Sequence, residues 1–287
     1  MADLSGKTIL ITGANQGIGK ASALALGKMG AKLVLVCRSA DKGREAVADL
    51  ERGGVKGIEL IVADMGKQAD VRRAAAEFKA KHDRLDVLLN NAGVLCTSRR
   101  ETVDGLEETF AINHMGYFLF TNLLLDVLKK SAPARIVNVA SHAHKGAKVA
   151  WDDPQLKQGW SAIKAYGQSK LCNILFTREL SRRLEGTGVT ANSLHPGVIG
   201  SGFGHTDGGF FAVLVSIAKP FMLTPEKGAR TQVWLASSPE VQGITGKYFD
   251  KCKESTPSPE ALDADAPARL WALSEKLAET AKQTAAA

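Results

Sequence analysis

Residues 7–19 read KTILITGANQGIG. The run from Lys7 to Thr12 has the length and apolar composition of a buried strand, and the stretch from Gly17 to Met29 has the pattern of a helix. Glycines in such a strand-turn-helix unit let the backbone turn tightly and approach a pyrophosphate, while the start of the helix offers free N–H groups. The spacing GxxxGxG departs from the general GxGxxG fingerprint, so a glycine turn without a ligand stays as the alternative.

Short apolar runs alternate with helical patterns along most of the chain. Parallel neighbouring strands need crossover connections, and these are usually helices. The sequence therefore predicts an α/β protein with a single-domain Rossmann fold, whose doubly wound parallel sheet has about seven strands and helices on both faces. Further strands are predicted at residues 32–37, 58–63, 87–90, 135–140, 190–194 and 247–249, and further helices at 40–52, 69–81, 106–130 with a break near Asn113, 162–184, 226–236 and 264–278, with fraying from 280.

The composition excludes several classes of protein. Of the 287 residues, 45% are hydrophobic and 23% are charged, which excludes a disordered chain. The formal charge is +7, but Lys and Arg are scattered and the few aromatic residues are not interleaved with them, so no nucleic-acid partner is predicted. The longest informative uncharged stretch, residues 109–125, contains Asn113, His114 and Asn122 and is too short for a bilayer, so no transmembrane segment is predicted.

The cysteines and the chain ends indicate a location and a domain organisation. Cys37, Cys96, Cys172 and Cys252 lie far apart without CxxC spacing, so neither a zinc site nor a disulfide framework is predicted. The first seven residues lead directly into an apolar run and leave no room for a signal peptide or an anchor helix. We predict a cytoplasmic protein with one domain over residues 1–287, a substrate-binding loop region at 200–225 and a C-terminal segment at 252–287 that ends in a helix.

The residues after the second predicted strand indicate which cofactor is bound. Dinucleotide-binding folds usually place an acidic residue there to hold the adenosine ribose, whereas this chain has Arg38 and Ser39. A guanidinium binds a 2′-phosphate through charge-assisted hydrogen bonds, and a carboxylate repels it. The sequence therefore predicts NADP(H) over NAD(H). The alternative is that Arg38 is a surface side chain that stacks on adenine.

Five further groups of residues accompany the glycine turn: Asn90-Asn91-Ala92-Gly93, Asn113, Ser141, Tyr166-Gly167-Gln168-Ser169-Lys170 and Pro196-Gly197. Together with residues 12–19 they resemble the cofactor loop, fourth-strand motif, catalytic Asn and Ser, YxxxK signature and nicotinamide loop of the short-chain dehydrogenase/reductase family. The resemblance covers residues 7 to about 249. It implies cofactor contacts from Gly13, Asn15, Gln16, Gly17, Ile18, Gly19, Arg38, Ser39, Asp64, Met65, Asn91, Ala92, Gly93, Tyr166, Lys170, Pro196, Gly197, Val198, Ile199 and Ser201.

The catalytic residues that the resemblance implies are Asn113, Ser141, Tyr166 and Lys170. Tyr166 and Lys170 are four apart and share one face of a helix. A phenol titrates near pH 10, so half-ionising it near neutrality needs a shift of roughly three units, which the Lys170 ammonium and an oxidised nicotinamide would supply. In the implied mechanism Tyr166 exchanges a proton with the substrate oxygen and Ser141 holds that oxygen. Lys170 also binds the nicotinamide ribose, and Asn113 positions a water that links Lys170 to solvent.

A finer resemblance is to the retinol-dehydrogenase-like branch, and light-dependent protochlorophyllide reductases share part of it. It rests on Cys37-Arg38-Ser39 and on residues 113–118, 169–173, 195–198 and 246–249. Apolar residues at 210–218 and 221–223 lie where the family has its substrate-binding loop, which predicts a bulky apolar substrate. Packing on the core, a membrane-surface contact and a subunit contact are the alternatives for this stretch. A homo-oligomer is left open.

The leading hypothesis is an NADP(H)-dependent carbonyl reductase or alcohol dehydrogenase with a small-molecule carbonyl or alcohol substrate. One alternative is a reductase of a carbon–carbon double bond on the same scaffold. The other is a non-catalytic NADPH-binding sensor, although such proteins commonly lack the Tyr or Lys that this chain retains. No metal is predicted, because the histidines near the proposed site lack metal-ligand spacing, and we interpret them as loop or pocket-lining residues: His142, His144, His195 and His205.

Overall fold

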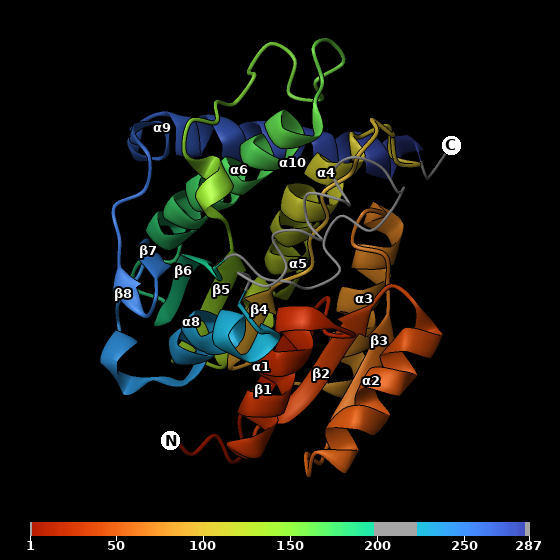
Figure 1. Ribbon diagram of the computed structural model, residues 1–287, viewed down its shortest axis with the longest axis vertical. Coiled ribbons are helices and arrows are strands. Elements are labelled where there is room, and N and C mark those ends of the chain that lie inside the picture. Colours follow the sequence, from red (N-terminus) through yellow and green to blue (C-terminus); the bar gives the residue numbers. More distant parts are fainter. Residues whose placement is uncertain (1, 198–222, 285–287) are drawn as a thin grey trace.

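An eight-stranded sheet runs through the centre of the molecule, with helices on both of its faces (Figure 1). The computed structural model describes residues 2–197 and 223–284, with side chains up to Glu279. The strand order is β3-β2-β1-β4-β5-β6-β7-β8, in which the first seven strands are parallel and β8 is antiparallel to β7. The strands are β1 (Thr8–Thr12), β2 (Lys32–Cys37), β3 (Ile58–Val62), β4 (Val87–Asn90), β5 (Ala134–Val139), β6 (Val189–His195), β7 (Tyr248–Asp250) and β8 (Lys253–Glu254).

Two hydrophobic cores lie on opposite faces of this sheet. Successive side chains of a strand point to opposite faces, so Leu10 of β1 joins one core while Ile9 and Ile11 join the other. The core of Leu10 includes residues of α3, α5, α6 and α10, and the second core includes residues of α1, α2 and α8. The predicted doubly wound α/β fold is thus confirmed. The helices are α1 (Gly17–Lys28), α2 (Ala40–Arg52), α3 (Gln68–Lys81), α4 (Glu108–Phe110), α5 (Gly116–Lys130), α6 (Ala162–Arg183), α8 (Pro225–Ser237), α9 (Pro259–Leu262) and α10 (Ala266–Thr284).

The helix predicted at residues 106–130 is interrupted where the sequence indicated. A π-helical turn at Ala111–Met115 separates α4 from α5 and contains Asn113. Such turns are rare and occur frequently at functional sites. The strand β8 and the short helix α9 were not foreseen, and α10 extends to Thr284 although fraying was expected from residue 280.

Between β1 and β4 the strand order of the sheet changes direction, because successive strands are added first on one side of β1 and then on the other. From β1 the order runs to β2 and β3 on one side and to β4 and β5 on the other. Ligands of open α/β sheets bind in the crevice outside such strand ends. The Thr12 hydroxyl holds the two strand ends together, because it accepts hydrogen bonds from the N–H groups of Asn91 at 2.9 Å and Ala92 at 3.0 Å.

The C-terminal helix α10 packs against α5 and α6. Its Trp271 is 5% exposed and contacts the rings of Phe118 and Phe176, with centroids 5.0 and 5.8 Å away. The Arg183 guanidinium lies 4.1 Å above the same indole ring. Part of the outer surface of α5 and α6 is therefore covered by a helix of the same chain.

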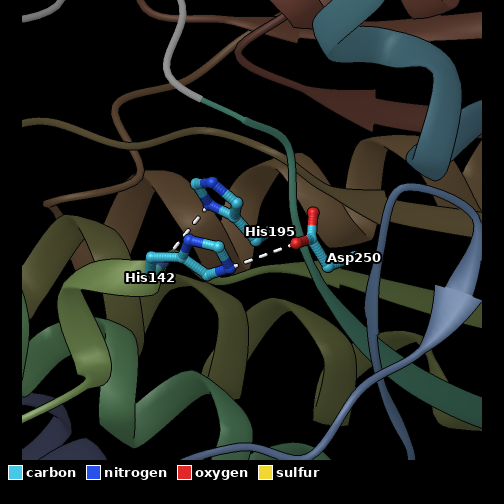
Figure 2. A group of neighbouring side chains, drawn as sticks. All are labelled: His142, His195 and Asp250. Atoms are coloured by element: carbon cyan, nitrogen blue, oxygen red, sulfur yellow. Dashed lines mark hydrogen bonds and ion pairs between the residues drawn. The ribbon is translucent and has the colours of Figure 1, made fainter.

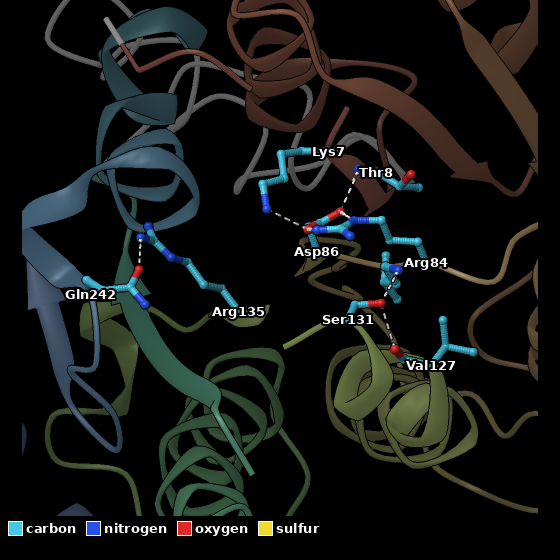
Figure 3. Close-up of polar contacts among 9 residues, drawn as sticks. Lys7, Thr8, Arg84, Asp86, Val127, Ser131, Arg135 and Gln242 are labelled. Atoms are coloured by element: carbon cyan, nitrogen blue, oxygen red, sulfur yellow. Dashed lines mark hydrogen bonds and ion pairs between the residues drawn. The ribbon is translucent and has the colours of Figure 1, made fainter. Parts of the chain in front are cut away.

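A buried carboxylate organises the opposite, amino-terminal end of the sheet (Figure 3). Asp86 accepts hydrogen bonds from the Lys7 ammonium at 3.0 Å, the Thr8 N–H at 3.0 Å and two nitrogens of Arg84 at 2.6 and 2.8 Å. This cluster fixes the start of β1 beside the start of β4 and lies away from the crevice. Among residues 2–197 and 223–284, the structure contains no helix long and apolar enough to cross a bilayer.

Candidate active site

The glycine turn after β1 fits closely against the end of β4. Gly13 has a φ of +66°, and a Cβ there would stand 2.7 Å from Cα of Ala92. A Cβ on Gly19 would lie 2.5 Å from Nδ2 of Asn91, whose side chain donates hydrogen bonds to the carbonyls of Thr12 and Gly13. A larger residue at either position would push the turn away from β4. The two glycines thus form a backbone surface that a ligand can approach.

The start of α1 is open to an anion. Gln16 is the N-cap in an extended conformation, and within the described part of the chain its side chain makes no capping hydrogen bond. The first turn, which begins at Gly17 and includes Ile18, carries no acidic side chain, and Asn15 is part-buried just before it. Uncapped N–H groups and the helix dipole together attract a phosphate. The residues present therefore fit the pyrophosphate of a dinucleotide.

The residues expected at the adenosine end lie at the neighbouring strand ends. Arg38 is exposed directly after β2, and among the described residues its guanidinium forms no ion pair. Ser39 caps α2, because its hydroxyl accepts a hydrogen bond from the N–H of Lys42 at 3.3 Å. Asp64 is part-buried after β3 and accepts a hydrogen bond from the N–H of Gly66, while Met65 is buried beside it. These residues thus follow the carboxyl ends of the neighbouring parallel strands β2 and β3, at one edge of the sheet.

At the nicotinamide end, Gly93 lies against the predicted catalytic residues. A Cβ on Gly93 would stand 3.3 Å from Oδ1 of Asn113 and 3.4 Å from Nζ of Lys170. Pro196 and Gly197 follow β6, and Gly197 has a φ of +96°. The remaining predicted contacts, Val198, Ile199 and Ser201, lie outside the described residues, as do His205 and residues 200–222 of the predicted substrate loop region.

Tyr166 and Lys170 lie on α6 and face the end of β5. The Lys170 ammonium is buried, donates a hydrogen bond to the carbonyl of Val139 at 3.0 Å and lies 5.6 Å from the centroid of the Tyr166 ring. Ser141 follows β5, and its hydroxyl hydrogen-bonds the part-buried Tyr166 phenol. The structure thus brings the serine and tyrosine hydroxyls together beside the lysine, which is the arrangement that the resemblance implied.

Burial shifts the proton affinities of these groups in opposite directions. It raises the pKa of Tyr166 to about 12, with a smaller lowering by the hydrogen bond to Ser141. It lowers the pKa of Lys170 to about 7. The neutral phenol is therefore the stable form at pH 7. The lowering of the tyrosine pKa that we expected from the Lys170 ammonium and an oxidised nicotinamide together stays a prediction.

Asn113 is fully buried in the π-helical turn and is held by its neighbours. Its Oδ1 accepts a hydrogen bond from the Val94 N–H at 2.8 Å, and its Nδ2 donates to the Val94 carbonyl at 2.9 Å and to the Ser169 hydroxyl at 3.0 Å. The side chain thus joins the loop after β4 to the helix that carries Lys170. These bonds fix the orientation of the side chain, and the expected role of Asn113 in positioning a water stays a prediction.

A buried polar ladder beneath the site was missing from the predicted site residues. Nδ2 of Asn90 in β4 donates hydrogen bonds to the Thr121 hydroxyl at 2.9 Å and to the side-chain Oδ1 of Asn138 at 2.8 Å. Asn138 of β5 donates in turn to the Thr177 hydroxyl at 2.9 Å. The ladder links two strands to α5 and α6. The available signal was an asparagine in each of two buried, mostly apolar strands.

Three residues of metal-ligating type meet beside Ser141: His142, His195 and Asp250 (Figure 2). The sequence spacing did not reveal them, since they come from the ends of three different strands. The two imidazole rings are stacked, with centroids 3.7 Å apart and planes at 18°. Nε2 of His142 lies 3.3 Å from Oδ2 of Asp250, and Nδ1 of His195 accepts a hydrogen bond from the His142 N–H at 3.2 Å. Nitrogens of nearly parallel stacked rings do not converge on one point, so this geometry does not fit a metal ion.

Comparison with known proteins agrees with this geometry. A family model described as short chain dehydrogenase matches residues 7–207. Retinol dehydrogenase 14 of Homo sapiens is 43% identical over 95% of this chain and 86% of its own length, and the WW domain-containing oxidoreductase of Gallus gallus is 40% identical over 96% of this chain and 69% of its own.

Solved structures with the same fold cover most of the chain. The crystal structure of an uncharacterised protein from Mycobacterium paratuberculosis has a TM-score of 0.79 and 31% identity, and it covers 97% of this chain and 96% of its own. The RhlG/NADP active-site complex of Pseudomonas aeruginosa has a TM-score of 0.68 and 26% identity, and the match covers 86% of this chain and 95% of the RhlG chain. The chain therefore belongs to the short-chain dehydrogenase family of oxidoreductases, in the branch that resembles the retinol dehydrogenases.

Proposed function

We propose that this protein is an NADP(H)-dependent reductase of carbonyl compounds and dehydrogenase of the corresponding alcohols, with Tyr166 as the acid and base. One observation carries the proposal: the Tyr166 and Ser141 hydroxyls lie together near the Lys170 ammonium. Beside them is a glycine turn that has no room for a Cβ atom. The NADP complex of RhlG and the exposed Arg38 after β2 support the choice of NADP(H).

Each part of the site has a distinct task in this reaction. The glycine turn and the start of α1 hold the pyrophosphate, and Arg38 holds the 2′-phosphate. NADPH supplies the hydride when bound. Tyr166 donates a proton to the substrate oxygen, because its raised pKa keeps it protonated at neutral pH. The Ser141 hydroxyl holds the same oxygen, and Lys170 orients the cofactor ribose.

The substrate that we propose is a bulky apolar carbonyl or alcohol. The support is the similarity to proteins named retinol dehydrogenases. The apolar stretches at residues 210–218 and 221–223 add to it, although they lie outside the described residues apart from Leu223. A cytoplasmic location is also part of the proposal, and four unpaired cysteines support a reducing compartment.

The test follows NADPH oxidation with a panel of aromatic, long-chain, retinoid-like and small polar carbonyls. We expect Tyr166→Phe to lower kcat by about 100- to 10,000-fold, since it keeps the ring and removes the proton. The dissociation constant of NADPH for the same variant is the control, and it is expected to stay within about threefold. Undiminished turnover in the variant would refute the role of Tyr166. Tight NADPH binding without turnover would favour the sensor, and turnover restricted to carbon–carbon double bonds would favour the other reductase.

A further inference from the structure

Two histidines hold the two ends of one peptide group next to the catalytic serine. The carbonyl oxygen of Ser141 lies 2.6 Å from Nδ1 of His144. The N–H of His142, which belongs to the same peptide group, donates a hydrogen bond to Nδ1 of His195 at 3.2 Å. Figure 2 shows the second of these contacts as a dashed line, with the His195 ring stacked over the His142 ring. The peptide plane after Ser141 is thus fixed from both sides.

The partners of each ring assign its tautomer. Nδ1 of His144 faces a carbonyl oxygen and must donate, while Nε2 of the same ring accepts a hydrogen bond from the Ser258 N–H at 3.1 Å. His144 therefore carries its proton on Nδ1. His195 accepts a hydrogen bond at Nδ1 and therefore carries its proton on Nε2. Both rings act as neutral imidazoles.

The surroundings of both rings favour this neutral form. His144 is fully buried and packs edge-on against Tyr248 at 5.0 Å, and burial lowers its pKa. His195 is 6% exposed, and burial together with His142 lowers its pKa to about 4. His195 belongs to β6, Tyr248 to β7, and Ser258 precedes α9. The two histidine rings therefore connect Ser141 to parts of the fold that are distant in sequence.

We propose that His144 and His195 are positioning residues that fix the Ser141 hydroxyl for the carbonyl reaction, an inference that rests on the function proposed above. Ser141 has extended backbone angles, φ −166° and ψ 158°, and its hydroxyl contacts both the Ala143 N–H at 3.2 Å and Tyr166. Rotation of the following peptide changes ψ of Ser141 and redirects the short turn to Ala143. The two imidazoles oppose that rotation, so they hold the hydroxyl beside the tyrosine.

The first arm of the test needs no substrate and measures how firmly the His142 N–H is held by His195. Labelling histidine with ¹⁵N gives backbone amide signals from only six residues, including His142. In His195→Leu, which removes the acceptor, we expect exchange of the His142 amide with solvent to accelerate by at least about 10-fold. In His195→Asn, whose Oδ1 replaces Nδ1, protection is expected to remain within about threefold of the wild type. Unchanged protection in the leucine variant would overturn the proposal.

The second arm measures the consequence for the reaction. We expect His195→Leu and His144→Leu each to lower kcat by about 10- to 100-fold, with NADPH affinity retained, and His195→Asn to recover most of the loss. His82→Leu removes another buried histidine, which is hydrogen-bonded to Glu59 of the distant strand β3, and is expected to leave kcat within about twofold. A fall in the His82 variant equal to that of His195→Leu would show a general loss of structure and overturn the assignment.

Double variants separate positioning from a merely structural role. In a Ser141→Ala background the substitutions at His144 and His195 are expected to change the residual kcat by less than about threefold, because the group that they position is gone. An undiminished effect there would overturn the proposal for that histidine. If the wild type turns over no carbonyl at all, the proposed function fails. The amide-exchange arm still decides whether His195 holds the peptide group after Ser141.

Discussion

Replacing Arg38 by Asp should reverse the cofactor preference. Arg38 is exposed at the carboxyl end of β2, and within the described residues it has no carboxylate partner, so its guanidinium is available to a 2′-phosphate. Hydrogen bonds to charged groups contribute about 1.5 to 3 kcal/mol. Their loss corresponds to a dissociation constant for NADPH that is about 10- to 150-fold higher. The new carboxylate accepts a hydrogen bond from a ribose 2′-hydroxyl, which we expect to tighten NADH binding by about 3- to 10-fold.

The assay is titration of NADPH and NADH by fluorescence at two salt concentrations. Because the site is exposed, the penalty for NADPH in the variant should shrink at high salt. The matched control is Arg44→Asp on α2, which makes the same change of charge nearby on a side chain that already pairs with Asp41. We expect the control to change the ratio of the two dissociation constants by less than about threefold. A ratio in Arg38→Asp that is no different from the control would refute the reasoning.

Two further predictions concern stability and are measured by urea unfolding. Asp86→Ala removes one partner of a buried charged cluster and should cost about 3 to 5 kcal/mol, whereas removal of the exposed Asp126 should cost less than about 1 kcal/mol. Burial raises the pKa of Asp86, but hydrogen bonds led by Arg84 outweigh it and leave the pKa lowered. The contribution of Asp86 to the free energy of unfolding should therefore be complete above the unfolded pKa of about 3.9 and be lost as the pH falls through the lower pKa of the folded state. A loss of this contribution that begins above pH 6 would contradict the assignment. Trp271→Ala should cost about 3 to 5 kcal/mol, because the indole joins α10 to α5 and α6, and a cost under about 1 kcal/mol would show that α10 is not docked through it.

Local patterns predicted most of the fold because they are properties of short segments. The predicted bounds of the second strand and second helix, 32–37 and 40–52, coincide with β2 and α2. β8 could not be predicted in this way, since it is a pair of exposed charged residues, Lys253 and Glu254. It exists because Lys251 and Cys252 adopt positive φ angles of 50° and 59° and turn the chain back onto β7. No glycine or asparagine marks that turn.

In the candidate site, too, local sequence patterns predicted some residues, whereas others depend on contacts that only the fold creates. The tyrosine, lysine and serine could be placed because their order and spacing resemble a family, and the fold then brings them together. The role of the histidines could not be predicted, since His144 meets Ser258 across 114 residues and His195 meets His142 across 53. Such pairs depend on which strand ends and loops become neighbours in the sheet. A spacing rule for metal ligands addresses one ligand geometry and says nothing about hydrogen bonds to a peptide group.

The proton affinities in the site bear on the protonation states that the proposed reaction requires. Burial raises the pKa of Tyr166 to about 12 and lowers that of Lys170 to about 7, so the protein's own groups keep a proton on the phenol at neutral pH. In the proposed reaction, the neutral phenol is the form that donates a proton during reduction. The reverse reaction needs a phenolate, which a positive charge close to Tyr166 stabilises. The buried Lys170 supplies that charge only in its protonated form, and the Val139 carbonyl, which accepts a hydrogen bond from Nζ of Lys170 at 3.0 Å, helps to hold it in that form.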